Sequence, residues 1–442
     1  MVSLILSNPD MNILIIGSGG REHAFAWKIR QSPLCTNLYV TPGNVGTSLL
    51  AENVNIGVDE FEKIKELCLA KKIDLVLVGP EVPLVAGIRD FFEADALLNQ
   101  ILMVGPGKEG AQLEGSKDFS KQFMLRHHVP TAKARTFQSN ETKAAIQYLE
   151  TCTPPIVLKA DGLAAGKGVI ISPSVAEAKQ EITEMLEQKK FGDASAKVLV
   201  EEFLDGIELS VFVLTDGENY VILPEAKDYK CIGDGDTGPN TGGMGAVSPV
   251  IFADSSFMKK VEENVIKPTV EGLRKEGISY RGFIFVGLMN VKGEPFVIEY
   301  NARMGDPETE VVLPRIESDL VELLVAAAKG DLKGKKISIR NEVAVTVVLA
   351  SGGYPDAFEK GKVISGSSTD RQSTLFHAGT KTQDKNIVTN GGRVMTATGT
   401  GGTLTDAVKN AYDLASTIEW DGIYYRKDIG QDLLRLESAN QG

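Results

Sequence analysis

The sequence predicts an α/β protein of several domains, and three observations carry this prediction. The chain has 442 residues, which suggests about three domains at roughly 150 residues each. Near the N-terminus, short apolar runs alternate with helical stretches, as in a parallel sheet whose strands are joined by helices. Toward the C-terminus, short strands separated by glycine turns, one of the strands being expected over 362–364, predict a small β-rich domain with one or two helices.

The first domain is expected at 11–116, behind an N-terminal extension, 1–10, that we predict to be disordered. A buried strand over Asn12 to Gly17 runs into a glycine turn and then into a helix that ends near Arg30. Strand, glycine turn and helix in this order open a nucleotide-type α/β unit.

The glycine turn holds Gly19 and Gly20 and nearly fits the dinucleotide fingerprint G-x-G-x-x-G. Glu22 occupies the third glycine position, which weighs against a dehydrogenase. A phosphate at the helix N-terminus still fits the turn, because backbone donors and the helix dipole point there. Arg21 could add a charged fork to the same phosphate.

Three further strands of the first domain are expected over 38–40, 74–78 and 102–105, with a helix over 59–70. The carboxyl ends of parallel strands meet at one edge of a sheet, where ligands bind. Each loop alone is by default a tight turn, but the loops together favour a site. The residues of these loops are Gly19, Gly20, Pro42, Gly43, Asn44, Gly79, Pro80 and Glu81.

The central region, 117–335, is built around a short apolar run that ends at Lys159. A loop with three glycines and Lys167 follows the run, and such a loop suits a phosphate chain. It is not a Walker A loop, because Asp161 replaces the first glycine and Gly168 replaces the magnesium-binding Ser or Thr. A flexible surface loop between strands is the alternative.

An acidic stretch, Glu201 to Glu208, follows a buried strand over Val198 to Val200. The backbone of an extended segment can bind an adenine edge, and a carboxylate a few residues on can accept both ribose hydroxyls. A solvated acidic turn is the competing interpretation.

A long glycine-rich loop, 237–245, lies further along the central region. Asp228, Lys230, Asp234 and Asp236 crowd around its start. The loop is too long for a simple turn, and loops of this kind are functional or disordered. Its charged flanks suit a small zwitterion or a sugar phosphate.

Glu299 and Asn301 give the clearest indication of a metal-binding site in the sequence. They stand two apart in a predicted strand, 296–301, so both side chains project from one face. Two hard oxygen donors followed by Arg303 suit magnesium that carries phosphates, because magnesium needs few protein ligands. An edge strand with a polar face is the alternative.

Composition weighs against several classes of function. The chain has 47 basic and 59 acidic residues, a net charge of −12, and is a poor candidate for nonspecific nucleic-acid binding. Its four scattered cysteines and four histidines offer no zinc spacing, and we expect reduced thiols in a cytoplasmic protein. No apolar run approaches the ~20 residues of a membrane span, and the N-terminus lacks the basic start of a signal peptide.

Eight motifs in register resemble the phosphoribosylamine–glycine ligase (glycinamide ribonucleotide synthetase) family of the ATP-grasp superfamily. In chain order they are GSGGREHA, PGN, GPE, QLEGSK, KADGLAAGKG, EEFLDGIE, GDTGPNTGGMGAVSP and NARMGDPE. The resemblance implies an ATP-grasp fold with a Rossmann-like N-terminal domain, 11–116, and an ATP-grasp domain, 117–335. It further implies a mobile lid at 131–200 and a β-rich C-terminal domain, 336–442, that completes the site.

The resemblance also implies a role for each motif. The implied ATP-binding residues are Lys117, Lys159, Gly162, Gly166, Lys167, Gly168, Glu201, Glu202, Phe203, Leu204 and Glu208. The implied substrate-binding residues are those of the three N-terminal loops together with Asp228, Lys230, Asn240, Thr241, Gly242, Gly243, Met244 and Arg303. Lys167, Asp228 and Arg303 would be catalytic, and Glu299 and Asn301 would bind Mg²⁺ or Mn²⁺.

The implied reaction joins glycine to phosphoribosylamine and cleaves ATP to ADP and phosphate, through glycyl phosphate, in purine biosynthesis. Its partners would be small molecules, with no nucleic acid and no membrane, and we expect a monomer. Another ATP-grasp carboxylate–amine ligase is the near alternative. A dinucleotide-dependent oxidoreductase or a nucleotide sensor is the distant one.

Several positions depart from the family pattern. Residues 226–231 read AKDYKC where the family often has SQDHKR, so the histidine and the arginine are missing. Met304 stands where Phe is usual and is a soft apolar replacement. Glu310 stands where Gln or Met is common, and it either adds a charge near a phosphate site or points outward. The segment 283–290 supplies no second metal carboxylate.

Overall fold

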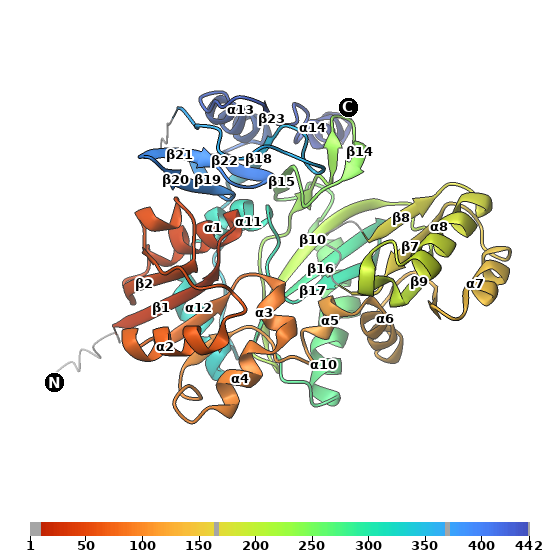
Figure 1. The fold of residues 1–442 in the computed structure, drawn as a ribbon, viewed down its shortest axis with the longest axis horizontal. Helices are drawn as coiled ribbons and strands as arrows, with labels where there is room; N and C mark the ends of the chain where they lie inside the picture. The colour runs from red at the N-terminus through yellow and green to blue at the C-terminus, as the bar shows by residue number, and fades with distance from the viewer. Residues whose placement is uncertain (1–9, 163–167, 367–371, 441–442) are drawn as a thin grey trace.

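The computed structural model describes residues 10–162, 168–366 and 372–440. An N-terminal sheet lies beside the central sheets, and the C-terminal sheet lies across both (Figure 1). All but the last residue of the predicted extension lie outside the described ranges, as do Gly166 and Lys167. Within those ranges, no helix has the length and apolar character needed to cross a membrane. The four cysteines are free thiols.

The N-terminal unit is a five-stranded parallel sheet with strand order β3-β2-β1-β4-β5. Along β1, Ile13 and Ile15 pack on one face and Leu14 and Ile16 on the other, because side chains alternate along a strand. Helices cover both faces, which confirms the predicted parallel α/β unit. Its elements are β1 (Met11–Gly17), α1 (Gly20–Ile29), β2 (Cys35–Pro42), η1 (Thr47–Leu49), β3 (Glu52–Asn53), α2 (Phe61–Lys71), β4 (Leu75–Val78), α3 (Glu81–Ala86), α4 (Ile88–Ala94) and β5 (Leu102–Val104).

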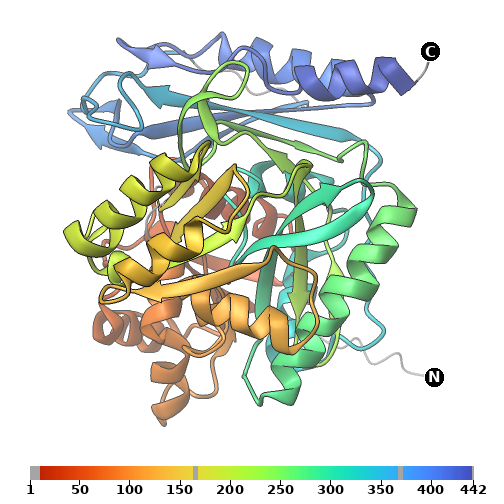
Figure 2. The ribbon, with the colours of Figure 1, turned by 90° about the vertical axis from the view of Figure 1, so that its right-hand side faces the viewer.

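The first central sheet, with strand order β6-β9-β7-β8, is antiparallel, and α7 and α8 lie side by side over it (Figure 2). On β7, Ile156, Leu158 and Ala160 pack against these helices. Lys159 therefore faces the opposite side of the sheet. The elements are α5 (Gln112–Gly115), α6 (Lys117–Arg126), β6 (Ala134–Gln138), α7 (Thr142–Leu149), β7 (Ile156–Ala160), β8 (Val169–Ser172), α8 (Val175–Gln188), η2 (Gly192–Ala196) and β9 (Lys197–Glu202).

The second central sheet is also antiparallel, with strand order β11-β10-β16-β17. Helix α12 leaves this unit and packs Leu320 and Leu324 against the core of the N-terminal sheet. The elements are β10 (Ile207–Thr215), β11 (Tyr220–Ile222), α9 (Ser255–Val261), the π-helical turn η3 (Glu262–Ile266), α10 (Lys267–Lys275), β16 (Gly282–Val291), β17 (Glu294–Asn301), α11 (Thr309–Arg315) and α12 (Leu320–Lys329).

The C-terminal sheet has the order β12-β15-β18-β22-β19, with β23 on β18, so two of its strands come from the central part of the sequence. That sharing was not predicted. The predicted strand 362–364 is wrong, because only an isolated bridge from Val363 to Val388 forms there. The elements are β12 (Lys227–Asp228), β13 (Cys231–Gly233), β14 (Thr237–Asn240), β15 (Gly245–Ser248), β18 (Val343–Ser351), β19 (Ser373–His377), β20 (Thr380–Gln383), β21 (Asn386–Thr389), β22 (Arg393–Gly401), α13 (Leu404–Ala415), β23 (Ile423–Tyr424) and α14 (Gln431–Asn440).

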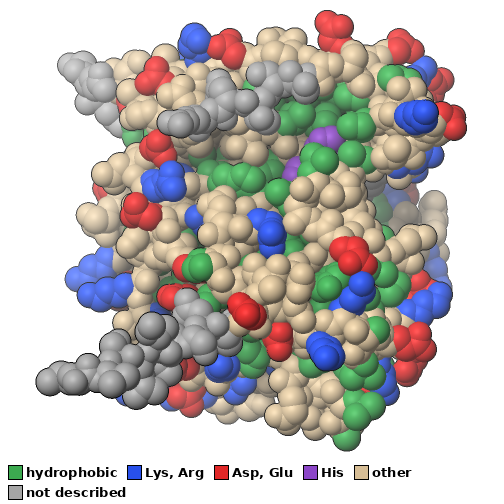
Figure 3. Space-filling view, turned by 90° about the vertical axis from the view of Figure 1, so that its left-hand side faces the viewer, with side chains coloured by type: hydrophobic (Ala, Val, Ile, Leu, Met, Phe, Trp, Pro, Cys, Tyr) green, Lys and Arg blue, Asp and Glu red, His purple; other side chains and the backbone are tan. Residues whose placement is uncertain are grey.

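Asn44 and two histidines join the N-terminal unit to the C-terminal sheet. The Asn44 amide donates to the carbonyls of Ser18 at 2.9 Å and of His377 at 2.7 Å, and the N–H of His377 donates to His23 Nδ1 at 2.8 Å. Burial lowers the pKa of His23 to about 3 and that of His377 to about 4. Histidine side chains are visible among hydrophobic ones on the face that Figure 3 shows.

We expect the two histidines to lower the free energy of unfolding as the pH drops, because both must stay neutral in the folded protein. Their pKa values lie below the 6.5 of an unperturbed histidine, so this stability is fully present above that pH and is lost as the pH falls toward 4 and 3. At about pH 5, each histidine should lower the free energy of unfolding by on the order of 2 kcal/mol relative to neutral pH.

Urea unfolding at about pH 7.5 and about pH 5 measures this difference. The variant His377→Asn keeps a polar group opposite Thr380 but takes up no proton, so between these pH values it should lose about 2 kcal/mol less stability than the wild type. A pH dependence as large as that of the wild type would contradict the assignment.

Candidate functional site

A buried carboxylate between two lysines connects the two central sheets. Glu201 on β9 accepts Lys159 Nζ at 2.8 Å and Lys121 Nζ at 3.0 Å. Lys159 also donates to the carbonyl of Ile298 on β17 at 2.8 Å, which ties the first central sheet to the second. Burial alone would raise the pKa of Glu201, but the two ammonium groups outweigh it and hold that pKa below its usual range. The acidic stretch is therefore not a solvated turn at Glu201.

Lys121 was not predicted. It stands four residues after Lys117 on α6, so the two lysines share a helix face, and that spacing was a usable signal. Lys117 Nζ donates to the carbonyl of Gly162 at 2.9 Å, at the point where the glycine loop leaves β7. Burial lowers the pKa of Lys117.

Asp161, which breaks the Walker A pattern, fixes the base of the glycine loop. Its Oδ1 accepts the Ser116 hydroxyl at 3.0 Å and the backbone N–H of Asp118 at 3.1 Å, at the start of α6. Gly162 has φ of +117°, which L side chains rarely adopt. The loop therefore starts from a fixed point beside Lys117. Gly168 is buried where the loop returns to β8.

Charged groups gather around Glu299 on β17. Lys230 contacts Glu208 on β10, and its Nζ lies 3.7 Å from Glu299 Oε1. Burial would raise the pKa of Glu299, but Lys230, Lys159, Lys117 and Arg303 outweigh it and hold that pKa low. Glu299 is thus an ionised carboxylate facing several cations, which suits a centre that handles phosphate.

Asn301 and Glu299 lie opposite Phe285 and Gly287 of β16, so they share one face of the sheet as predicted. In the described residues, no group of three or more His, Cys, Asp or Glu side chains gathers as a metal site. The two oxygen donors fit a divalent cation that takes its remaining ligands from phosphate or water.

Arg303 connects the loop after β4 to the end of β17. Its Nη2 lies 2.7 Å from Glu114 Oε1, and its Nε lies 3.3 Å from Glu81 Oε2. Glu114 also accepts the backbone N–H of Ala302 at 2.8 Å. Glu114 stands in the motif QLEGSK but had no predicted role. Gly79, two residues before Glu81, packs against Glu22.

The turn at α1 differs from the prediction. Glu22 folds back and accepts the N–H of Gly19 at 2.5 Å and Arg21 Nε at 2.6 Å. Asp306 Oδ2 accepts the N–H of Arg21 at 3.4 Å. Protein carboxylates therefore occupy this helix end, and Arg21 is buried against Glu22, so a phosphate at this point has to compete with them.

A cavity of about 330 Å³ opens beside this turn, between the N-terminal loops and the C-terminal sheet. It brings together the predicted Gly19, Gly43 and Asn44, and the C-terminal sheet contributes Arg393, whose Nη2 lies 3.1 Å from Asp306 Oδ1. The lining residues are Ser18, Gly19, Gly43, Asn44, Asp306, Tyr354, Ala378, Gly379, Thr380, Asn390 and Arg393. Polar groups from two units thus converge on one hollow.

Glu310 does not point outward. It is fully buried, and neither carboxyl oxygen has a hydrogen-bond partner among the described residues. Burial raises its pKa well above the usual range, and Asp306 adds to this rise. Glu310 points inward because α11 packs against α1 and turns the side chain toward Gly20. A Cβ at Gly20 would overlap a Glu310 oxygen. The neighbouring Glu308 is buried beside Asp228, and burial raises its pKa to about 8.

The other predicted residues lie where the sheets end. Glu202 and Phe203 are exposed at the end of β9, and Leu204 is half-buried. The Thr241 hydroxyl donates to the carbonyl of Lys230 at 2.8 Å. Met244 is fully buried, and its backbone N–H and carbonyl bond to Tyr229 and Val348, so its predicted contact with substrate is not available in this conformation.

Together, a parallel nucleotide-type sheet and two antiparallel sheets that meet at Lys159 and Glu201 define an ATP-grasp protein. Family models for phosphoribosylglycinamide synthetase match three parts of the chain: the N domain over 11–114, the ATP-grasp (A) domain over 115–309 and the C domain over 344–432. The chain belongs to the phosphoribosylglycinamide synthetase family.

Individual relatives match over nearly the whole chain. The phosphoribosylamine–glycine ligase of Vibrio cholerae is 48% identical over 97% of this chain and 100% of its own length, and that of Escherichia coli O6:H1 is 46% identical over 97% and 100%. The crystal structure of phosphoribosylamine–glycine ligase from Thermotoga maritima is 37% identical, with a TM-score of 0.82 over 95% of this chain and 100% of that one.

A more distant structure shares the fold alone. The biotin carboxylase domain of 2-oxoglutarate carboxylase from Hydrogenobacter thermophilus, described with MgADP and bicarbonate, is 17% identical. Its TM-score is 0.71, over 94% of this chain and 91% of that one.

The packing of Glu310 on Gly20 gives a prediction. Gly20→Ala should lower the free energy of unfolding by about 1–3 kcal/mol, because the new methyl group overlaps the buried carboxyl. Adding Glu310→Gln should not restore stability, since the amide is as large, whereas adding Glu310→Ala should. Denaturant unfolding of the single and double variants measures this, and a rescue by Gln as large as the rescue by Ala would contradict the steric origin.

Proposed function

We propose that this protein joins glycine to phosphoribosylamine to give glycinamide ribonucleotide, ADP and phosphate, in purine biosynthesis. Relatives named phosphoribosylamine–glycine ligase match nearly the whole chain at 37–48% identity. The observation that carries the proposal is that Lys117, Lys159 and Glu299 gather at the junction of the two central sheets.

ATP would bind between the two central sheets. Lys117 and Lys159 would face the phosphates from the base of the loop that ends at Gly168, and Lys167 of that loop would join them. The backbone of 201–204 would bind adenine, since β9 ends at Glu202 and the chain continues without regular structure. Glu208 on β10 would accept the ribose hydroxyls, a role that requires its contact with Lys230 to loosen.

Glu299 and Asn301 would hold a divalent cation, Mg²⁺ or Mn²⁺. Both side chains offer oxygen donors from one face of β17, and the low pKa of Glu299 keeps it ionised. A bound cation would neutralise phosphate charge at the reacting end of ATP.

The chemical difficulty is that a carboxylate is a poor acyl donor. A glycine carboxylate oxygen would attack the γ-phosphorus, the bond to ADP would break, and glycyl phosphate would form. The amine nitrogen of phosphoribosylamine would then attack the acyl carbon, releasing phosphate and a proton. The residues present suit this route, because it needs positioning and charge neutralisation rather than a protein nucleophile.

The two other substrates would bind on the side of the C-terminal sheet. The cavity lined by Gly19, Asn44 and Arg393 suits the sugar phosphate. Asp228, Lys230 and the loop from Asn240 to Met244 would bind glycine and the amine, with Arg303 near the transferred phosphoryl group.

We further propose that the protein works as a cytoplasmic monomer with small-molecule substrates and without nucleic-acid or membrane partners. The net charge of −12 supports the absence of a nucleic-acid partner, because an acidic protein is repelled by nucleic acid.

Glu299→Gln should reduce kcat/KM by about 100-fold or more and raise the Mg²⁺ concentration needed for half-maximal rate, because a charged oxygen ligand is lost. Calorimetry should show weaker binding of ATP with Mg²⁺ but unchanged binding of ATP without it. Glu294→Gln, on the exposed end of the same strand, is the matched control and should behave as wild type. Full activity of Glu299→Gln would contradict the metal role.

The test of the function is phosphate release from MgATP, with phosphoribosylamine generated in place from ribose 5-phosphate and ammonia, with and without glycine. Release that requires both substrates, together with glycinamide ribonucleotide identified by mass, is the expected result. Release with neither substrate, or none in any combination, would overturn the assignment and leave another ATP-grasp carboxylate–amine ligase.

A further inference from the structure

The C-terminal unit makes hydrogen bonds and ion pairs to the segment from 230 to 244, here called the substrate loop. It leaves β12, forms the β13–β14 hairpin and returns to β15, and it lies next to the C-terminal elements in Figure 1. Its ends carry Lys230 and the glycine-rich stretch from Asn240 to Met244, which are predicted substrate residues.

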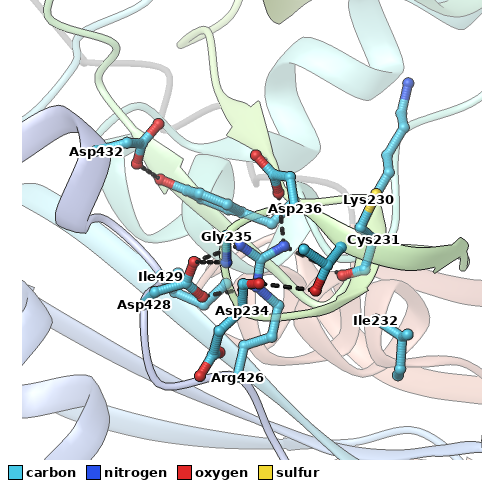
Figure 4. Close-up of polar contacts among 12 residues, drawn as sticks. Lys230, Cys231, Ile232, Asp234, Gly235, Asp236, Arg426, Asp428, Ile429 and Asp432 are labelled. Carbon is cyan, nitrogen blue, oxygen red and sulfur yellow. Dashed lines mark hydrogen bonds and ion pairs between the residues drawn. The ribbon is translucent and has the colours of Figure 1, made fainter.

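Arg426 binds the hairpin end of the substrate loop. It is 1% exposed and is the largest fully buried side chain described. Its Nη1 donates to the Cys231 carbonyl at 3.1 Å and to Asp236 Oδ1 at 2.7 Å (Figure 4). Its Nε and Nη2 each lie 2.7 Å from an oxygen of Asp428, which fixes the guanidinium plane.

Neighbouring groups of the C-terminal unit hold the same hairpin. The Tyr424 hydroxyl donates to the Ile232 carbonyl at 2.8 Å. The backbone N–H of Lys427 donates to Asp234 Oδ1 at 2.9 Å, and the N–H of Gly235 donates to Asp428 Oδ2 at 2.8 Å. The hairpin is thus attached along its length rather than at one point.

Arg393 binds the glycine-rich end of the substrate loop. Its Nη1 donates to the carbonyls of Gly242 at 2.8 Å and Asp306 at 2.6 Å, and the N–H of Gly242 donates to the Tyr354 hydroxyl at 3.0 Å. Arg393 therefore ties the loop to the segment that follows Asn301, and it also lines the 330 Å³ cavity.

The position of the loop sets the position of charged groups in the site. Thr241 donates its N–H and its hydroxyl to the Lys230 carbonyl, each at 2.8 Å, and the Lys230 ammonium lies between Glu208 and Glu299. A glycine-rich loop without anchors samples many conformations, and ordering it on binding would cost affinity.

We propose that Arg393 and Arg426 are positioning residues that hold the substrate loop in its binding conformation from the C-terminal unit, so that glycine and the amine meet a preformed site. This inference rests on the proposed assignment of Asp228 and the loop to those substrates. Neither arginine is required to touch the reacting atoms.

The test weakens the anchors without burying an unpaired charge. The double variant Asp236→Asn with Tyr424→Phe removes the ion pair between Arg426 and the hairpin and the hydrogen bond from Tyr424, and Arg426 keeps Asp428. The Asp236 side chain is 61% exposed and Tyr424 is 36% exposed, so both tolerate the change. Asp413→Asn, which removes an exposed ion pair with Lys409 on α13, is the matched control.

The double variant should raise KM for glycine and for phosphoribosylamine about fivefold to tenfold. Its KM for MgATP and its Tm should stay close to those of the wild type and of the control. An unchanged KM for glycine, or an equal rise in KM for MgATP, would overturn the inference.

Asp228→Asn separates this inference from the proposed function. If Asp228→Asn raises KM for glycine but the double variant does not, the site assignment holds and the positioning role falls. If Asp228→Asn leaves KM for glycine unchanged, the site assignment falls and the positioning role falls with it.

Discussion

The site depends on the pairing of Glu201 with Lys159 and Lys121. A buried carboxylate is costly unless charged partners compensate it, and removing one partner from such a group is strongly destabilising. Lys159 meets this need and also donates to the Ile298 carbonyl on β17. One side chain therefore holds the first central sheet against the strand that carries Glu299, and it places an ammonium group where ATP phosphates are proposed to bind.

Similar charge pairs are found at other boundaries between units of the chain. Arg303 joins β17 to Glu81 and Glu114, Arg393 joins the C-terminal sheet to Asp306, and Arg426 joins it to Asp236. Each guanidinium has several donors in a fixed plane, so it can hold carboxylates and carbonyls from different segments at once. The site is thus assembled by charge pairs across unit boundaries, while an apolar core shared by the N-terminal sheet, the second central sheet and the C-terminal sheet packs these units together.

Much of the architecture could be predicted from the sequence because its signals are local. The apolar run of β1, the alternation that puts Glu299 and Asn301 on one face, and the glycine turns all depend on neighbouring residues. The partners of these groups could not be predicted in the same way. Glu114 is far from Arg303 in the chain, and the inward orientation of Glu310 is set by the packing of α11 on α1.

The misplaced strand at 362–364 has a related cause. The segment around Val363 does pair with β21, since Ile364 donates to the Ile387 carbonyl and Thr389 donates to the Lys362 carbonyl. The pairing is only one bridge long, and alternation of residue types does not reveal how far a pairing extends. The contribution of β12 and β15 to the C-terminal sheet was not predicted either, because β15 pairs with β18, a strand far along the chain.

The shared sheet bears on how the chain acquires its structure. During synthesis, β12 and β15 emerge about a hundred residues before β18, which is the strand that β15 pairs with. Until β18 arrives, the edge of β15 has no such partner, and an unpaired edge invites pairing with other chains. The anchors of the loop proposed to receive glycine lie in the last part of the chain, so a nascent or truncated chain would hold the proposed ATP-binding elements without a completed acceptor site.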